Sequence, residues 1–505
     1  MKKKLIGFFL ATVLSSAAHA GTFDVTRMDD PVPDGCKVDD CSLREAVIDA
    51  GQTAAKDTIV LPAGVYLIDL AGNDVSENTG DLDISTDMEI VGAPSIIDGQ
   101  ELGRIIEIRS GANVTLRDLT LRNANTSLDT NGTLNGGALQ INGGSLTLDS
   151  VTFDSNSTQT LGGAIYAFGD AIVDIDGCLF VNNNAGSGAA IFASTGITVS
   201  NTDFQGNRAS RGGATYLDGS TSDSRFEGVT FDQNIASDSG GAIRFFGREL
   251  FLDSLIATNN AATGGAGGVL AVSGTAHAKQ VEIVNATFDD NMADDGGAIS
   301  FASGNPDTLD IRHSSFVNNK ATGWGGAVNL TGGKVEVTNS TFSGNQTSDI
   351  GGAIQLFGAE LTLHHTTFSG GSADRGDALY VGGSPGISMA KLANNLIDGE
   401  CSISDAETVT SLGGNVEGSG DSCALDAGSD LVNQSSAQLG LQPLRENSGG
   451  TPTHELTSGS VARGQAELAI CELVKIDQLF MRRGSPCNSG AVESETIFRD
   501  GFESS

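Results

Sequence analysis

One alternation of hydrophobic and polar residues repeats nine times along the middle of the chain. Its first copy reads LTLDSVTFDSN at residues 146–156, followed by GGAIY at residues 162–166. The first and last copies lie 215 residues apart over eight steps, so the period is about 27 residues, which is typical of stacked repeats. The Phe slot of these copies holds Phe153, Phe180, Phe204, Phe231, Ala257, Phe288, Phe316, Phe342 and Phe368.

Each copy contains three short runs in which hydrophobic and polar residues alternate, as at Leu146/Leu148, at Val151/Phe153 and around Tyr166. Alternation with a period of 2, bounded by Gly, Asn, Asp and Ser, predicts β-strands. A unit this small must stack on its neighbours to bury its apolar face. The sequence therefore predicts an all-β fold, a parallel β-helix of about nine to thirteen coils in a rod roughly 45 to 60 Å long. Because parallel crossover connections are right-handed as a rule, we expect a right-handed helix.

Three features of the repeat are predicted to be structural: the Phe slot, an Asn slot three residues after it, and a Gly-Gly-Ala corner. The Phe slot should form a stacked aromatic ladder in the core. Asn tolerates left-handed backbone and forms local hydrogen bonds, so we expect the Asn slot to turn the chain and to bond the same amide in neighbouring coils. Gly-Gly-Ala, first at residues 162–164, supplies a second corner. The Asn slot holds Asn156, Asn183, Asn207, Asn234, Asn260, Asn291, Asn319 and Asn345.

The paired FxxN and GGA[IV] motifs between residues 136 and 380 resemble the polymorphic outer membrane protein repeats of bacterial surface β-helix adhesins. This resemblance implies the architecture and display on a surface. It does not imply a ligand.

The N-terminus has the features of an export signal. Three lysines at residues 2–4 precede an apolar run at residues 5–14, and Ala18-His19-Ala20 forms an A-x-A cleavage site. We therefore predict a signal peptide over residues 1–20 and an exported protein. No later apolar run approaches eighteen residues, so we expect no transmembrane segment after signal cleavage.

Residues 21–83 are predicted to form the N-terminal cap and the first strands of the rod. Ser42 and Glu45 form a capping box in front of a short amphipathic helix, and Cys36 and Cys41 are spaced for a disulfide. The segment CSLREA at residues 41–46 resembles the CSLREA domain, which precedes β-helices in exported bacterial proteins. Covering the first sheet edge against other strands explains such a cap, and we favour this role over binding.

The repeat pattern covers residues 84–383 and then decays into an irregular, cysteine-bearing region at residues 384–493. The spacing of its cysteines suggests the disulfides Cys401–Cys423 and Cys471–Cys487. This leaves Cys178, which occupies an inward slot and should be a buried, inert thiol. The segments NSGGTPTHEL at residues 447–456 and CNSGAVE at residues 487–493 resemble the C-terminal region of the choice-of-anchor family. Residues 494–505 form a tail.

Charge excludes one class of partner. The formal net charge is −35, and removal of the three signal lysines makes it −38, so we expect no nucleic-acid partner. A strongly acidic exported chain gains solubility from this charge, or binds divalent cations. Calcium is accordingly the one candidate cofactor, and no other is expected.

The chemistry-bearing residues gather at the corners before Gly-Gly. Hydrolysis of a polysaccharide requires two carboxylates facing one groove, and Trp324 beside them could stack a sugar ring or flank calcium. Acidic turns are also common in an acidic chain, so we predict no catalytic residue. His313 and His365 share a bend slot two coils apart, too far to share a metal ion, and are predicted to be structural. The candidate metal ligands are Asp294, Asp295, Asp349 and Asp374.

Regular coils with short turns favour a displayed surface. We expect a secreted or outer-surface adhesin or extracellular scaffold, monomeric, whose acidic face binds a glycan, a host or matrix protein, or a cation. One alternative is a polysaccharide-active lyase or hydrolase that uses carboxylates on the turns. A second alternative is a passive structural protein of the envelope.

Overall fold

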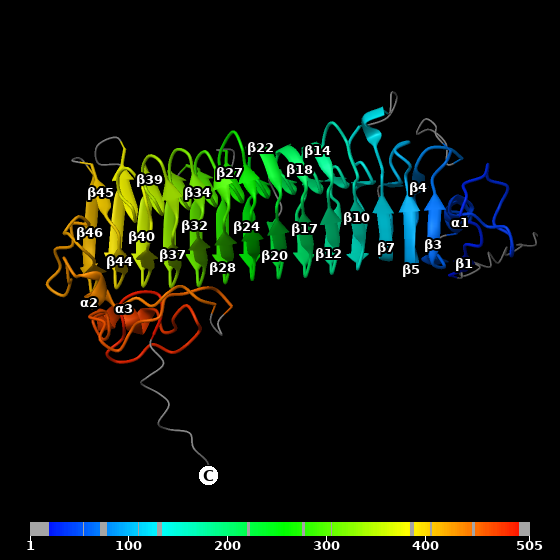
Figure 1. Cartoon of the computed structure of the whole chain (residues 1–505). Helices are drawn as coiled ribbons and strands as arrows, with labels where there is room; N and C mark the ends of the chain where they lie inside the picture. Colours follow the sequence, from blue (N-terminus) through cyan, green and yellow to red (C-terminus); the bar gives the residue numbers. More distant parts are fainter. Residues whose placement is uncertain are drawn as a thin grey trace, which may run out of the picture.

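The computed structural model describes residues 20–493 except residues 54, 71–77, 110, 129–133, 220–222, 275–277, 305, 384–387, 405–406 and 447–449. The predicted signal peptide, except Ala20, and the predicted tail lie outside the described residues. The chain winds into a rod of stacked coils (Figure 1), and a view along the rod shows the coils superimposed. Neighbouring strands of the coils run parallel, which confirms the predicted parallel β-helix.

The largest sheet has 27 strands, because most coils contribute two strands that meet at a bend. We call these the first and second arms of the long sheet. The first arm contains β1 (Thr22–Asp24), β2 (Asp57–Val60), β5 (Met88–Asp98), β7 (Asn113–Arg122), β9 (Ser145–Asp149), β12 (Ile172–Asp176), β16 (Ile197–Ser200), β20 (Asp223–Glu227), β24 (Glu249–Asp253), β28 (Gln280–Val284), β32 (Thr308–Arg312), β36 (Lys334–Thr338), β40 (Glu360–His364), β43 (Met389–Ala393) and β46 (Thr408–Gly413). The second arm contains β3 (Gly64–Leu67), β10 (Thr152–Asp154), β13 (Leu179–Val181), β17 (Asp203–Gln205), β21 (Thr230–Asp232), β25 (Ile256–Thr258), β29 (Thr287–Asp289), β33 (Ser315–Val317), β37 (Thr341–Ser343), β41 (Thr367–Ser369), β44 (Leu396–Asp398) and β47 (Val416–Glu417).

Two smaller sheets complete the coils. A sheet of 13 strands contains β4 (Leu82–Ile84), β6 (Ile106–Ile108), β8 (Leu139–Asn142), β11 (Ile165–Phe168), β15 (Ile191–Ala193), β19 (Thr215–Leu217), β23 (Ile243–Phe245), β27 (Leu270–Ser273), β31 (Ile299–Ala302), β35 (Val328–Thr331), β39 (Ile354–Phe357), β42 (Leu379–Gly382) and β45 (Cys401–Ile403). A sheet of seven contains β14 (Asn184–Ser187), β18 (Arg208–Arg211), β22 (Ile235–Ser239), β26 (Ala261–Ala262), β30 (Met292–Ala293), β34 (Lys320–Ala321) and β38 (Gln346–Thr347). A 3₁₀ turn, η1 (Thr126–Leu128), lies outside the sheets.

The core contains the predicted ladders. Phe204 stacks between Phe180 and Phe231, with ring centroids 4.9 and 4.8 Å apart, and the smaller Ala257 interrupts the series. The Asn slot bonds successive coils, because Asn183 Nδ2 donates to Asn207 Oδ1 at 3.0 Å. The same nitrogen donates to the carbonyl of Phe153, so the buried amide is satisfied on both sides.

The prediction that the Asn slot itself takes left-handed backbone is wrong. The residue before it does so, as at Asn182 with φ 56° and Asn259 with φ 56°. A second left-handed residue forms the bend between the two arms. This bend slot holds Ser150, Gly177, Asn201, Gly228, Ser254, Asn285, His313, Asn339, His365 and Asn394.

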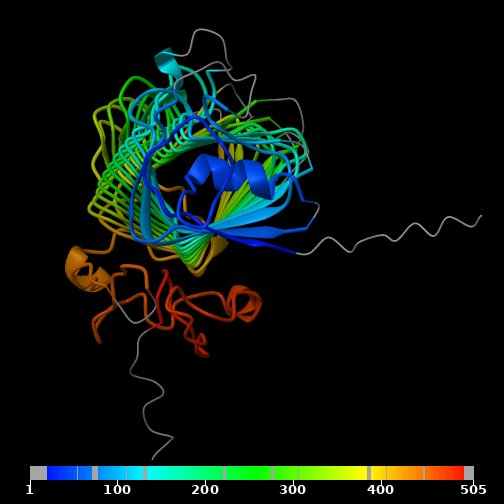
Figure 2. The same cartoon turned by 90° about the vertical axis from the view of Figure 1, so that its right-hand side faces the viewer.

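Helix α1 (Leu43–Ala50) lies across the open end of the first coils (Figure 2). Ser42 and Glu45 form the predicted capping box, and the predicted Cys36–Cys41 disulfide is present. Arg44 fixes the helix from within, since its Nε donates to Asp30 Oδ1 at 2.8 Å and both side chains are buried. The apolar face of α1 joins the core of the rod and so covers the N-terminal end of that core.

The coils extend beyond the predicted residues 84–383 at the C-terminal end, where β43 to β47 follow residue 383. At the other end, β2 and β3 join the long sheet within residues 21–83, where the first strands were predicted. These coils keep the alternation of period 2 but lack the Phe, Asn and Gly-Gly-Ala letters that defined the repeat. Alternation, rather than those letters, therefore decides where the β-helix ends.

The remainder of the C-terminal region, residues 418–493, is mostly irregular and contains α2 (Ser436–Leu439) and α3 (Leu468–Leu473). We call it the C-terminal module. It lies along the side of the rod (Figure 1, orange to red). The predicted disulfides Cys401–Cys423 and Cys471–Cys487 are present, and the remaining Cys178 is buried as predicted. Burial raises the pKa of the Cys178 thiol to about 12, so it is unreactive.

Candidate binding groove on the first arm

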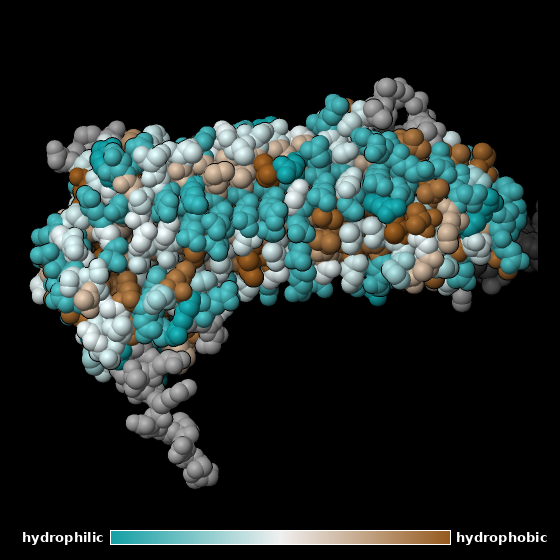
Figure 3. Space-filling model, in the orientation of Figure 1, coloured by the Kyte–Doolittle hydropathy of each residue, from teal (hydrophilic) through white to brown (hydrophobic). Residues whose placement is uncertain are grey.

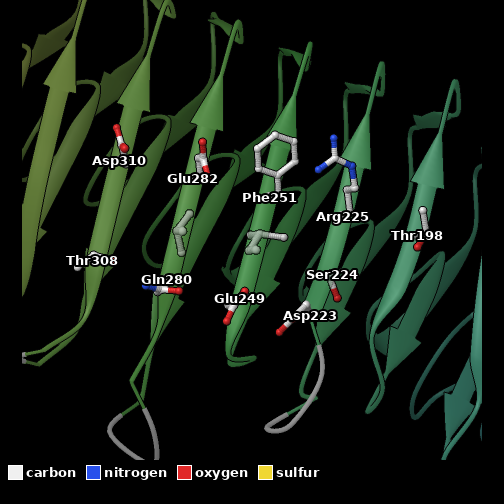
Figure 4. A pocket seen from close by; sticks show the side chains of 12 residues that line it. Thr198, Asp223, Ser224, Arg225, Glu249, Phe251, Gln280, Glu282, Thr308 and Asp310 are labelled. Atoms are coloured by element: carbon white, nitrogen blue, oxygen red, sulfur yellow. The ribbon is translucent and has the colours of Figure 1, made fainter. Parts of the chain in front are cut away.

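A shallow groove of about 560 Å³ crosses the outer face of five neighbouring strands, β16, β20, β24, β28 and β32. The parallel register aligns one outward residue of each strand in a row along the rod (Figure 4). A second groove, of about 400 Å³, shares Asp310 with the first and continues over β36 and β40. The row consists of Thr198, Arg225, Phe251, Glu282, Asp310, Glu336 and Thr362.

The aromatic member of the row is Phe251. The guanidinium of Arg225 lies over its ring, with Cζ 4.0 Å from the ring centroid. This cation–π contact holds a half-buried ring and an exposed charge side by side on neighbouring strands. Such a pair offers a ligand both an apolar surface and hydrogen-bond donors.

Carboxylates outnumber arginines around the groove. Asp223, Glu249, Glu282 and Asp310 line it, whereas Arg225 is the one basic residue among its lining residues. Arginines at the rim compensate part of this charge: Arg248 lies 2.7 Å from Asp223 and 3.2 Å from Glu249. The face of the rod that Figure 3 displays is accordingly mostly hydrophilic, with scattered hydrophobic residues.

Asp310, where the two grooves meet, has the most perturbed carboxyl of the row. Its side chain is 39 % exposed, but Oδ1 is inaccessible and has no hydrogen-bond partner among the described residues. Burial raises the pKa of Asp310 to about 6, helped by Glu336 and Glu282 and opposed by Arg312, which lies 3.2 Å from Asp310. A large share of these side chains is therefore protonated at pH 6, unlike an ordinary Asp.

Glu336, the next residue in the row, is perturbed in the opposite direction. His364 Nδ1 lies 3.7 Å from its Oε1, and this contact lowers the pKa of Glu336 against the effect of burial. Asp310 and Glu336 are register partners on adjacent strands, and neighbouring strands of a sheet lie roughly 4.8 Å apart. A carboxyl with a raised pKa next to one with a lowered pKa is an arrangement typical of a general acid beside an ionised carboxylate.

The corner predicted to hold chemistry lies elsewhere, beside the sheet of seven strands. Trp324 is 44 % exposed there, and its backbone N–H donates to Asp295 Oδ1 at 2.9 Å. Its indole Nε1–H donates to Asp349 Oδ2 at 3.1 Å. Burial raises the pKa of Asp295, opposed by the bond from Trp324 and helped by Asp294 and Asp349. The structure thus brings Trp324, Asp295 and Asp349 together, and their hydrogen bonds hold the corner itself.

The other two candidate ligands are spread along neighbouring coils. Asp294 Oδ1 accepts a bond from Thr322 at 2.9 Å, and the backbone N–H of Asp374 donates to the Asp349 carbonyl at 2.9 Å. Among the described residues, the one group of three acids close enough to share a metal ion is Asp81, Asp83 and Glu107, which we had not predicted.

Ion pairs account for that acidic group. Arg104 lies 2.9 Å from Asp81, and Arg109 lies 2.7 Å from Asp83. The two arginines offset the negative charge that would attract a cation. We assign no metal site to it.

The sequence did not point to the groove residues, because the Phe, Asn and Gly-Gly-Ala letters that define the repeat lie in other slots. A signal was nevertheless present: Phe251 occupies an outward slot that holds Thr198 in an earlier coil and Thr362 in a later one. A bulky aromatic residue in a slot whose other members are polar or charged is unusual, since outward positions do not need to fill a core.

Residues 104–342 match the family model described as the right-handed beta helix region, and residues 339–356 match the Chlamydia polymorphic membrane protein repeat. The first match confirms the predicted fold class and agrees with the predicted hand. The second agrees with the resemblance seen in the FxxN and GGA[IV] motifs. The segments that resemble the CSLREA and choice-of-anchor families lie outside both matches.

No curated protein sequence matches the chain. Among solved structures, the catalytic domain of GH87 alpha-1,3-glucanase in complex with nigerose is similar at a TM-score of 0.38 and 15 % identity, over 74 % of this chain and 67 % of that one. Pectate lyase Pel9A is similar at a TM-score of 0.28 and 12 % identity, over 95 % and 98 %. Likeness this distant says nothing about activity. No helix in the described part of the chain has the length and apolar character needed to cross a bilayer.

Proposed function

We propose that this protein is an exported, surface-associated β-helix protein that binds a glycan chain along the groove of the first arm. The Arg225–Phe251 pair carries the proposal, because sugar rings stack on aromatic faces while their hydroxyls bond charged side chains. The groove runs along the rod over neighbouring strands, so a linear polymer can occupy several coils at once. The resemblance to polymorphic membrane protein repeats supports display at the outer surface.

Charge narrows the class of glycan. Carboxylates outnumber arginines along the groove, and the whole chain carries a net charge of −35. A polyanionic glycan would be repelled by the carboxylates that line the groove. We therefore expect a neutral or amine-bearing glycan. Binding of a matrix protein, or of calcium, would not depend on the Arg225–Phe251 pair.

The test is affinity electrophoresis of residues 21–505 through gels that contain dextran, chitosan or polygalacturonate. We expect retardation by a neutral or amine-bearing polymer and none by polygalacturonate. Phe251→Ala should weaken that binding about tenfold, because the lost stacking is worth about 1.4 kcal/mol. Phe357→Ala, which removes a ring 45 % exposed at the end of β39, is the matched control and should leave binding unchanged. Equal retardation of both variants would contradict the proposal.

Asp310 and Glu336 favour a second candidate, hydrolysis of the bound glycan. Asp310 would protonate the glycosidic oxygen as its bond to the anomeric carbon breaks, and ionised Glu336 would form a bond to that carbon. Water would then replace Glu336 at the anomeric carbon and return a proton to Asp310. The predicted hydrolase alternative placed its carboxylates on the turns, whereas this pair lies on the sheet face.

Chain shortening by residues 21–505 tests the second candidate. We expect Asp310→Asn to reduce it at least a hundredfold, and Asp223→Asn, which removes a carboxylate from the same groove, to leave most of it. Because the acid must be protonated, the rate should fall as the pH rises through about 6. Binding without any shortening would leave the glycan-binding proposal standing and remove hydrolysis.

A further inference from the structure

The C-terminal module contains a basic cavity that the proposed function does not use. It has a volume of about 500 Å³ and lies between α3 and the segment that follows it, lined by Leu468, Glu472, Lys475, Arg482 and Arg483 among others. An antiparallel bridge between Ile476 and Arg482 brings the basic residues together, and the Cys471–Cys487 disulfide closes the segment. Three basic residues and one acidic residue line this cavity, in a chain whose net charge is −35.

Arg483 forms the buried wall of the cavity. Its side chain is fully buried, and Glu493 is its ion-pair partner at 3.4 Å. Nη1 and Nη2 are occupied by bonds to Glu493, Asn339 and neighbouring carbonyls, whereas Nε has no partner among the described residues. One N–H donor of the guanidinium therefore lies buried inside the module without a partner among the described residues.

The exposed basic residues of the cavity also lack ion-pair partners among the described residues. Lys475 and Arg482 form no ion pair with any residue that the structure describes, although 63 acidic residues stand in the sequence. Burial lowers the pKa of Arg483 to about 10, opposed by Glu493 and Asp477. The surrounding acids thus compensate the buried charge only in part, and an anion in the cavity would complete the compensation.

Exposed large hydrophobic residues are concentrated in the chain segment that lines the same cavity. Residues 468–481 contain five of the sixteen exposed large hydrophobic residues of the described chain. Leu473 is 70 % exposed and Met481 is 52 % exposed. Basic and apolar side chains that alternate on one short exposed segment are typical of surfaces that contact anionic lipid.

We propose that the segment 468–485 of the C-terminal module is a binding surface for an anionic, phosphate-bearing lipid at a bilayer surface. The headgroup phosphate occupies the cavity, where Lys475 and Arg482 donate to it. Leu473 and Met481 contact the apolar part of the lipid layer. At physiological ionic strength charges are screened beyond about 8 Å, so this local basic site acts independently of the acidic rod.

Vesicle flotation with residues 21–505 tests this inference. We expect binding to phosphatidylglycerol vesicles and none to phosphatidylcholine vesicles. The double variant Lys475→Glu/Arg482→Glu should lose at least tenfold in affinity for phosphatidylglycerol. Arg483 is not varied, because its bond to Asn339 holds the module to the rod.

The matched control is Lys391→Glu/Arg445→Glu, which changes the net charge equally but leaves the cavity intact. Its vesicle affinity should equal that of the unmodified protein. Equal losses in both variants would mean that net charge alone governs binding, and would overturn the inference. So would equal binding to both lipids, or full displacement from the vesicles by millimolar glycerol phosphate, which would indicate a site for soluble phosphate. None of these outcomes bears on glycan binding.

Discussion

The bend between the two arms has the same backbone in both halves of the rod but different surroundings. At Asn201, in the N-terminal half, φ is 47° and the exposed amide donates to Asp176 at 2.8 Å. At Asn339, in the C-terminal half, φ is 49°, and the buried side chain accepts from Arg483 and donates to the carbonyl of Ile476. The coil geometry is thus common to both halves, while the C-terminal module changes what the bend side chains contact.

The C-terminal module also covers other positions in the C-terminal half of the rod. Thr341 donates to Gln478 Oε1 at 2.7 Å, and the His313 ring stacks on Phe480 with centroids 4.6 Å apart. His365, two coils further, is completely buried. The repeat thus defines a scaffold. The side chains in its outward and bend slots differ according to whether solvent or the C-terminal module lies outside them.

The largest expected effect lies inside the rod, where the two halves should not differ. Phe204→Ala and Phe342→Ala each remove a buried ring stacked on both sides, and each should cost about 3 to 5 kcal/mol in the free energy of unfolding. Denaturant titration followed by circular dichroism measures both. A clearly smaller cost in one half would mean that the core ladder is not uniform.

An intermediate effect is expected at the bend, where the halves should differ. Asn339→Gly keeps the left-handed backbone accessible but loses the bonds to Arg483 and Ile476, which should cost about 2 kcal/mol. Asn201→Gly loses only an exposed bond and should stay within about 0.5 kcal/mol. Limited proteolysis should release the module faster in the first variant alone. Similar behaviour of the two variants would remove the distinction between covered and bare bends.

The smallest effect at neutral pH concerns the buried histidines. Burial lowers the pKa of His365 well below its usual value, to which Arg483 and His364 contribute, and burial also lowers the pKa of His313 and of His454. A folded-state pKa below the unfolded one means that stability is fully present above about pH 6.5 and is lost as the pH falls toward the folded values. The docked module should therefore become easier to digest on acidification.

His365→Asn provides the control, because Asn occupies the same slot at Asn339 and Asn394. This variant should shift the onset of proteolysis to lower pH. An onset that stays at the same pH would mean that His365 does not contribute to the acid sensitivity of docking.

The sequence was sufficient to predict the features that repeat in register from coil to coil. The Phe ladder, the inter-coil bonds of the Asn slot and the capping helix follow from period-2 alternation and local capping chemistry. The three cysteine pairs follow from spacing. The docking of the module could not be predicted in this way, because its contacts join residues such as Thr341 and Gln478, 137 positions apart, with no local signal.

The candidate site was predicted less well for a related reason. Asp295 and Asp349 stood out as acids next to Trp324, and they do meet it, but through bonds that stabilise the corner. The Arg225–Phe251 pair depends on the register between two strands that are separated by a whole coil. Outward slots tolerate almost any polar residue, so such a pair is visible only once the coils are aligned in space.

The most direct measurement of the central claim is a crystal structure of residues 21–505 with a hexasaccharide of whichever neutral or amine-bearing glycan retards the protein. We expect sugar rings along the first arm, from β20 to β36, with one ring against Phe251 and hydroxyls bonded to Arg225. Sugar bound only at the Trp324 corner, or only on the C-terminal module, would contradict it.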